Sequence, residues 1–340
     1  MKNVVILTSS KHGKPFIGDE QFYKKLITQL KDRNAEGYVF PFSMQNRELI
    51  AYKWQPDTST WLKTTCPKPS VVYNRYPYRE LEKNKQVQSY LKFLEEENIP
   101  FFNSCFFRKE NVAQLLQKNR YTAVHFPNTV PVTNVIAFKH FLDKYSEVFI
   151  KDVHGSQGNG IWKVTKHRDD CYTLVSQRKT FHDLSFKKIM YLLTPLFKKR
   201  QLILQEGIPL KQVDEFRYDF RILMHFVKNK WSLIGFAPRV AKKDGLTTHV
   251  PKGGKLVSVN DVPFIPPEKK IKEIGRSIGK LLQQRFGNVN EFSFDLGVDE
   301  SNHPWIFDVN SKPMVFDEEH IQEKCIRSLA YMLLSTTNEK

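Results

Sequence analysis

The chain has 340 residues, 40% of them hydrophobic and 26 of them Phe, which is enough apolar material for about two globular domains and excludes intrinsic disorder. Lys and Arg number 53 against 36 Asp and Glu, and the net charge of +17 favours polyanionic ligands. The basic residues are spread along the chain without a zinc-finger or ribonucleoprotein motif, so nucleic acid is not expected as the main partner.

The sequence contains neither paired cysteines nor a long apolar segment, which excludes several classes of protein. The four cysteines form no Cys-x-x-Cys pair, so neither a zinc cluster nor a disulfide scaffold is indicated. The first apolar run covers only residues 4–7, too short for a signal peptide, and no later run approaches the length of a membrane span. We therefore expect a cytoplasmic protein with reduced thiols.

Residues 1–107 are predicted to form an N-terminal α/β domain, because short apolar runs alternate with amphipathic segments. Strands are expected at residues 4–7, 38–42, 71–73 and 99–103, and helices at residues 19–31 and 79–98. The stretch 55–69, which contains Pro, Thr and Trp, is expected to be irregular.

Residues 108–340 are predicted to form a second domain, with subdomains at about 108–200 and 201–340. Its strands are expected at residues 147–151, 161–165, 172–175, 202–205, 217–227, 231–240, 292–298 and 305–310, and its helices at residues 108–118, 134–144, 267–285 and 318–334.

The last two predicted strands carry the first candidate site. Apolar and polar residues alternate in both, and the turn formers 299–304 join them, which predicts an antiparallel hairpin with Asp295 opposite Asp308. Asp308 and Asn310 share one strand face. Two carboxylates and an amide are hard oxygen ligands suited to Mg²⁺ or Mn²⁺ with a polyphosphate, although an ordinary hairpin with a solvated polar face fits the same pattern.

A glycine-rich loop, 155–160, follows Lys151 at the end of a predicted strand. Such a loop can cover phosphates with its backbone N–H groups, or it can be a plain turn. It is not a Walker A loop, because Ile161 and Trp162 stand where Lys and Ser or Thr are required.

Two arginines lie on a second predicted hairpin, in which folding about Asn229 places Arg239 opposite Asp219 and Arg221 on the same face as Asp219. The pattern fits a structural ion pair or a clamp for phosphoryl oxygens. The apolar strand 202–205 and its continuation through Ile208 can border an adenine or lie buried between subdomains.

Taken in order, these segments resemble an ATP-grasp enzyme. The chain is similar to the YheC/YheD family of ATP-grasp proteins, described as endospore coat-associated in Bacillus-type bacteria, and the runs that carry the similarity are VVYNR (71–75), FNSCFF (102–107), FPNT (126–129) and DVNSKP (308–313). The resemblance implies a pre-ATP-grasp-like N-terminal domain followed by two subdomains with the nucleotide between them, and a location in the spore coat as an alternative to the cytoplasm.

The resemblance also implies a role for each candidate site residue. The phosphates of ATP would contact Lys109 and Lys151, the lid over them would comprise Gly155, Ser156, Gln157, Gly158 and Gly160, and the adenine would be bordered by Gln205, Glu206 and Ile208. The catalytic residues would be Lys151, Arg221 and Arg239, and the ligands of one or two Mg²⁺ would be Asp295, Asp308 and Asn310.

The sequence departs from the family pattern at two of these positions. Asp308 replaces the usual Glu, and Asp152 follows Lys151 where the family has Pro. Neither change removes a ligand type.

The function implied is an ATP-dependent ligase, which activates a carboxylate as an acylphosphate for attack by an amine or similar nucleophile. The basic surface favours an acidic peptide or polymer as a partner, beside other spore-coat proteins. Two alternatives stay open, namely a structural coat component that keeps the fold without turnover, and an ATP-dependent phosphotransferase.

Overall fold

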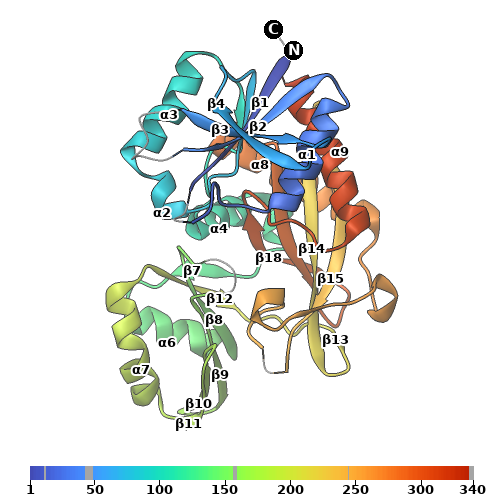
Figure 1. Cartoon of the computed structure of the whole chain (residues 1–340). Helices are drawn as coiled ribbons and strands as arrows, with labels where there is room; N and C mark the ends of the chain where they lie inside the picture. The colour runs from blue at the N-terminus through green and yellow to red at the C-terminus, as the bar shows by residue number, and fades with distance from the viewer. Residues whose placement is uncertain (11–12, 43–48, 156–158, 244, 337–340) are drawn as a thin grey trace.

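The computed structural model describes residues 1–10, 13–42, 49–155, 159–243 and 245–336. Within these ranges three six-stranded sheets carry the fold, and helices cover them (Figure 1). The predicted α/β class is confirmed.

The first sheet has the order β4-β3-β2-β1-β5-β6 and is parallel from β2 to β6. β1 reads as a continuous apolar run because helices cover both of its faces: Ile6 packs against α1, and Leu7 packs against α3. The elements are β1 (Lys2–Thr8), α1 (Glu20–Lys31), β2 (Ala35–Pro41), β3 (Ile50–Gln55), β4 (Thr60–Thr65), β5 (Val71–Asn74), α2 (Arg79–Glu82), α3 (Lys85–Glu96) and β6 (Phe101–Phe102).

Two expectations for this region are wrong in part. The stretch 55–69 is irregular only in part, because β3 and β4 form a hairpin in which Trp54 pairs with Trp61 across the strands. The stretch 79–98 is not one helix either: the chain breaks at Asn84, whose side chain accepts a hydrogen bond from the N–H of Gln86 at 2.9 Å and caps a new helix.

The second sheet has the order β11-β10-β9-β8-β12-β7, and α6 and α7 cover one of its faces. Its elements are β7 (Thr129–Pro131), α6 (Val135–Lys144), β8 (Glu147–Asp152), β9 (Ile161–Arg168), β10 (Cys171–Val175), β11 (Thr180–Leu184), α7 (Phe186–Lys199) and β12 (Leu202–Glu206). Because β12 pairs with β8, this sheet continues beyond residue 200, where we expected the subdomains to divide. The division into domains stays a prediction.

The third sheet runs β16-β15-β14-β17-β18, with β13 paired to β14. Its strands are β13 (Gln212–Val213), β14 (Phe216–Val227), β15 (Lys230–Val240), β16 (Lys255–Leu256), β17 (Glu291–Val298) and β18 (Pro304–Asn310). The helical segments that follow or cover it are α4 (Lys109–Lys118), α5 (Arg120–Ala123), η1 (Val250–Lys252), η2 (Val259–Asp261), α8 (Glu268–Phe286) and α9 (Glu319–Ser335).

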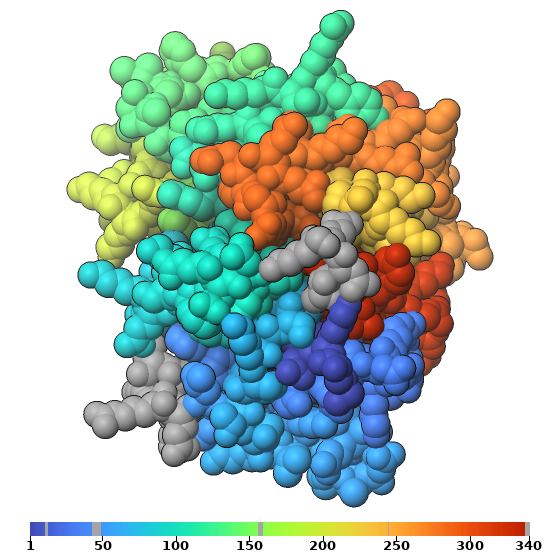
Figure 2. All heavy atoms as spheres, turned by 90° about the horizontal axis from the view of Figure 1, so that it is seen from above, coloured from blue at the N-terminus to red at the C-terminus, as the bar shows by residue number. Residues whose placement is uncertain are grey.

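The two faces of the third sheet belong to different cores. Phe292 and Phe294 pack against α8 and α4, whereas Leu223 and Ala237 pack against α9. α9 lies beside α1, so the C-terminal helix joins the first and third sheets in one core (Figures 1 and 2). Among the described residues, no helix combines the length and the apolar character that crossing a bilayer requires.

Candidate active site

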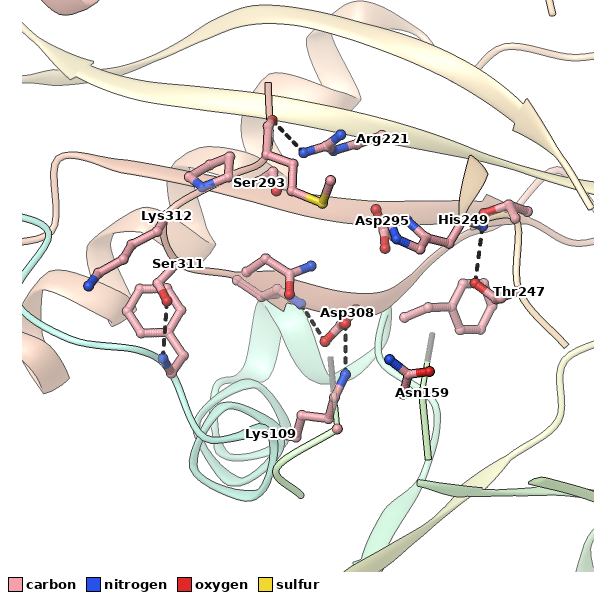
Figure 3. Close-up of a pocket in the computed structure, with 18 of the residues that line it drawn as sticks. Lys109, Asn159, Arg221, Thr247, His249, Ser293, Asp295, Asp308, Ser311 and Lys312 are labelled. Carbon is pink, nitrogen blue, oxygen red and sulfur yellow. Dashed lines mark hydrogen bonds and ion pairs between the residues drawn. The ribbon is translucent and has the colours of Figure 1, made fainter. Parts of the chain in front are cut away.

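A cavity of about 470 Å³ lies where the three sheets meet (Figure 3). The predicted site residues that line it are Lys109, Lys151, Gly155, Gln205, Ile208, Arg221, Arg239, Asp295, Asp308 and Asn310. Gly160 and Glu206 are not among the lining residues. Ser156, Gln157 and Gly158 lie outside the described part of the chain.

The cavity floor consists of the two hairpins that the sequence predicts, and both predicted pairings are confirmed. Asp219 lies opposite Arg239 between β14 and β15, and Asp295 lies opposite Asp308 between β17 and β18. Arg221 is the partner of Asp295 across β14 and β17. Residues from four adjacent strands therefore meet on one sheet.

Each hairpin reaches this register through a bulge. The turn of β14–β15 pairs Val227 with Lys230, and the register then shifts by one residue between Leu223 and Met224. A second shift in β17–β18 falls beside Asp295. Bulges of this kind re-aim side chains next to functional sites, and here each one lies between the turn and the charged pair.

Arg239 forms a buried charged cluster in the cavity with Asp219 and Asp295. Its Nη2 donates to Asp219 Oδ1 at 3.0 Å and to Asp295 Oδ1 at 2.8 Å, and Thr248 donates to Asp219 Oδ2 at 2.6 Å. Burial alone would lower the pKa of Arg239, but the two carboxylates raise it above its ordinary value. Arg239 is therefore a fixed positive charge at the floor of the cavity.

Arg221 lies beside this cluster, and its guanidinium forms no ion pair within 4 Å among the described residues. It donates to the carbonyl of Met314 at 2.6 Å and stacks over Phe316 at 4.5 Å. Burial and the charge of Arg239 lower the pKa of Arg221 to about 10, so it is still charged at neutral pH. Its charge is available to an anionic ligand.

His249 adds a neutral ring to the same end of the cavity. Burial and the charges of Arg239 and Arg221 lower its pKa, and its Nε2 is buried without a hydrogen-bond partner among the described residues. No sequence pattern pointed to His249 or Thr248, because both lie in the irregular segment after β15.

Two lysines, Lys109 and Lys151, lie close to Asp308. Lys109 donates to Asp308 Oδ2 at 2.7 Å (Figure 3), and Lys151 donates to Gln205 and to the carbonyl of Phe307, the latter at 3.3 Å. Burial raises the pKa of Asp308, but Lys109 and Lys151 outweigh it and hold that pKa below its ordinary value. Burial, aided by Lys109, lowers the pKa of Lys151 to about 8.

Asp152 forms hydrogen bonds to residues at both ends of the glycine-rich loop. Its carboxylate accepts from Arg200 at 2.7 Å and from the N–H of His154 at 2.9 Å, and its own N–H donates to Gly160 at 2.8 Å. Gly160 has φ +72°, and a Cβ there would lie 2.7 Å from the Cβ of Asp152. Glycine is thus required at this position.

The predicted adenine-bordering residues divide into two groups. Gln205 and Ile208 line the cavity, and Gln205 is fixed by its hydrogen bond to Thr129 at 3.1 Å. The side chain of Glu206 is held by Asn128 at 2.9 Å and is not part of the lining.

Lys312, at the end of the hairpin motif, ties the cavity to the first sheet. Its buried ammonium donates to Glu82, to Asn74 Oδ1 at 3.0 Å and to the carbonyl of Tyr76 at 3.2 Å. Burial lowers its pKa to about 8. Its nearest partners lie in the N-terminal part of the chain, so no local pattern could reveal them.

The donor set at the floor of the cavity fits Mg²⁺. Asp295, Asp308 and Asn310 supply hard oxygens on neighbouring strands, which Mg²⁺ prefers.

A different group, buried His225, Glu291 and Cys325, has its ligand atoms within 4.8 Å of one another among the described residues. Tyr73 donates to Glu291 at 2.9 Å, and Ser328 is hydrogen-bonded to His225 at 2.9 Å. Hydrogen bonds to neighbouring side chains therefore hold Glu291 and His225 in place, and no metal is needed to explain why these polar side chains are buried together.

Comparison with known proteins decides the family. Residues 98–336 match the family described as YheC/D like ATP-grasp. The chain belongs to this family. The endospore coat-associated protein YheD of Bacillus subtilis (strain 168) is 29% identical over 323 residues, which cover 88% of this chain and 69% of YheD. The resemblance inferred from the sequence is confirmed.

Solved structures show that this YheC/D-like chain has the ATP-grasp fold. The ATP-grasp ligase PsnB complexed with a minimal precursor aligns with a TM-score of 0.57 at 14% identity, over 98% of this chain and 99% of PsnB. The D-alanine-D-alanine ligase from Coxiella burnetii aligns with a TM-score of 0.56 at 10% identity, over 100% of this chain and 97% of the ligase. At these identities the likeness concerns the fold alone.

Proposed function

We propose that this chain is an ATP-dependent ligase that binds Mg-ATP and activates a carboxylate as an acylphosphate. The observation that carries the proposal is the convergence of phosphate-binding and metal-binding residue types in one cavity of an ATP-grasp fold. These residues are Lys109, Lys151, Arg221, Arg239, Asp295 and Asp308.

In this proposal ATP lies between the second and third sheets. Lys109 and Lys151 bind its phosphates, and Gln205 and Ile208 border its base. Asp295, Asp308 and Asn310 would hold Mg²⁺, which neutralises charge on the phosphate oxygens when bound. Asp308 is paired with Lys109, so Lys109 would exchange that carboxylate for a phosphate oxygen as the nucleotide binds.

The reaction consists of two displacements, for which positioning and electrostatics suffice. An oxygen of the substrate carboxylate attacks the terminal phosphorus of ATP, the bridging P–O bond breaks, and ADP leaves. An amine nitrogen then attacks the acyl carbon, the C–O bond to phosphate breaks, and the amine loses a proton to the released phosphate. Arg221 and Arg239 stabilise the charge that develops on the phosphoryl oxygens.

For the substrate acid and the acceptor we propose only a chemical class. The net charge of +17 and the arginines in the cavity favour an acidic peptide or polymer. A RiPP-associated ATP-grasp ligase of Chryseobacterium gregarium, which has the same fold, is solved in complex with a leader and core peptide, and the coat association in the name of YheD suggests a role in the spore.

The test is ADP release from Mg-ATP in the presence of amino acids, acidic peptides and spore extract. We expect release that depends on one of these additions, and Asp308→Asn should abolish it, because the variant loses a metal-binding carboxylate. Asp169→Asn, at an exposed position, is the matched control and should not change the rate. ADP release without a new amide or free phosphate would indicate a phosphotransferase, and ATP binding without turnover would indicate a structural coat protein.

A further inference from the structure

The cavity extends past the two hairpins to the carboxyl ends of β1 and β5 in the first sheet. β1 is parallel to β2 on one side and to β5 on the other, and the chain passes through α1 to β2 before it returns to β5. This point is a topological switch, where loops leave adjacent strands in opposite directions and open a crevice that commonly binds ligands.

Arg75 lies over this crevice. It directly follows β5, its N–H donates to the carbonyl of Leu7 in β1 at 2.9 Å, and its side chain lines the cavity. That side chain is only 14% exposed. A charge desolvated to this degree requires a partner.

The hydrogen bonds that the protein offers do not satisfy all N–H groups of Arg75. Its Nη1 is buried and has no hydrogen-bond acceptor among the described residues, and the nearest carboxylate oxygen, Oε2 of Glu291, is 3.9 Å away. Glu291 already accepts from Tyr73 at 2.9 Å and from Asn103 at 3.4 Å. Tyr23 is hydrogen-bonded to the guanidinium as well. A guanidinium has five N–H donors, and Nη1 remains unpaired among the described residues, so Arg75 retains capacity for an anion.

The charges around Arg75 point to the same ligand class. Arg79 and Arg221 line this part of the cavity and donate to the backbone carbonyls of Phe107 and Met314, both at 2.6 Å. Carboxylates influence both guanidinium groups, but the pKa of each is still lowered from its ordinary value, chiefly by burial. Asp19, whose Oδ1 accepts from the N–H of Phe22, is an exposed acid on this side, and buried Glu82 is paired with Lys312. Three arginines, Arg75, Arg79 and Arg221, therefore line this end of the cavity.

We propose that Arg75 binds a second, unreactive carboxylate of the acid whose first carboxylate is activated at Arg221 and Arg239, so that the substrate is a diacid. This inference rests on the proposed ligase function. The crevice at the switch point is then the subsite that distinguishes diacids from monoacids. A guanidinium forms two parallel, charge-assisted hydrogen bonds to a carboxylate, and a neutral carboxamide cannot accept both.

The test measures binding to the full chain by calorimetry in the presence of Mg-AMP-PNP. The probes are glutarate and the dipeptide Glu-Glu, each paired with an analogue in which one carboxylate is a carboxamide. We expect the wild type to bind at least one acid about tenfold tighter than its carboxamide, as loss of a hydrogen bond to a charged group implies. Arg75→Gln should abolish this preference, and Arg75→Lys should retain part of it.

Arg33→Gln, at an exposed arginine, is the matched control and should leave the preference intact. The melting temperature and the Mg-AMP-PNP affinity of each variant report whether it is folded. The inference is overturned if the wild type binds nucleotide but does not prefer any diacid, or if Arg75→Gln keeps the preference. Failure of the wild type to bind nucleotide would overturn the proposed function as well, so the two failures are distinguishable.

Discussion

Lys151, which we propose binds phosphate, has a pKa that burial lowers and that nearby carboxylates raise. Its pKa of about 8 means that it is mostly charged at neutral pH and mostly neutral one unit above that pKa. Only the charged form attracts phosphate. We therefore predict that the affinity for Mg-AMP-PNP falls about tenfold between pH 7 and pH 9, as calorimetry can measure.

The control for this pH dependence is Lys151→Arg, because arginine keeps its charge throughout that range. Its affinity should change by less than about threefold between the same pH values. If the wild type shows no loss of affinity, Lys151 does not contact phosphate in the way we propose.

Residue pairs could be predicted from the sequence only where a short turn joins the partners. Asp219 with Arg239 and Asp295 with Asp308 lie on hairpins, and strand period with turn position sufficed to pair them. The environment of Arg75 could not be predicted, because its nearest carboxylate, on Glu291, belongs to a different sheet. The roles of the paired residues in binding remain predictions.

Helix α8 approaches the third sheet at Gly279. A Cβ at this position would lie 2.3 Å from the ring of Trp231, and the ring is held by its hydrogen bond to Gln283 at 3.1 Å. We predict that Gly279→Ala lowers the free energy of unfolding by about 2 kcal/mol, because a rigid ring must move. Chemical denaturation measures this change.

Gly275, one turn earlier in the same helix, is the matched control. A Cβ there meets Sδ and Cε of Met224, the end of a flexible side chain that can move. The gain in helix propensity, about 1 kcal/mol, should offset most of the remaining cost in Gly275→Ala. Equal stability of the two variants would contradict this description of the interface.

Elements were predictable from the sequence where their hydrophobic period was strong. α1, α8 and β14 were recognised by that period, whereas α7 was missed because Pro195 interrupts it. The β3–β4 hairpin was missed for another reason: β4 is mostly exposed, so Thr and Lys hide its alternation. In α7 the cap Ser185 and the buried pair Ile189 and Leu193 were the available signals.

At the scale of the whole molecule, the buried ion pair between Lys312 and Glu82 connects the third sheet to the helix that follows β5 of the first sheet. The two side chains are 3% and 5% exposed. We predict that Lys312→Met lowers the free energy of unfolding by about 3–5 kcal/mol, because it leaves a buried carboxylate unpaired. Adding Glu82→Gln should restore part of that loss.

The control for this pair is Lys92→Met, which removes an exposed partner of Glu96 and should cost less than about 1 kcal/mol. A loss in Lys312→Met no larger than in Lys92→Met would show that the connection does not stabilise the molecule.

At the scale of the molecule, the order of motifs in the sequence predicted the ATP-grasp fold correctly, but it did not predict how the three sheets enclose one cavity. That arrangement depends on contacts between distant segments, such as α9 with α1. We propose above that the cavity binds Mg-ATP between the lysines Lys109 and Lys151 on one side and the carboxylates Asp295 and Asp308 on the other.

The most direct test is calorimetric titration of AMP-PNP with and without Mg²⁺ into the wild type and Asp308→Asn. We predict one nucleotide per chain, an affinity that rises with Mg²⁺, and a loss of that rise in Asp308→Asn. Absence of nucleotide binding by the wild type, or the same Mg²⁺ dependence in the variant, would contradict the account.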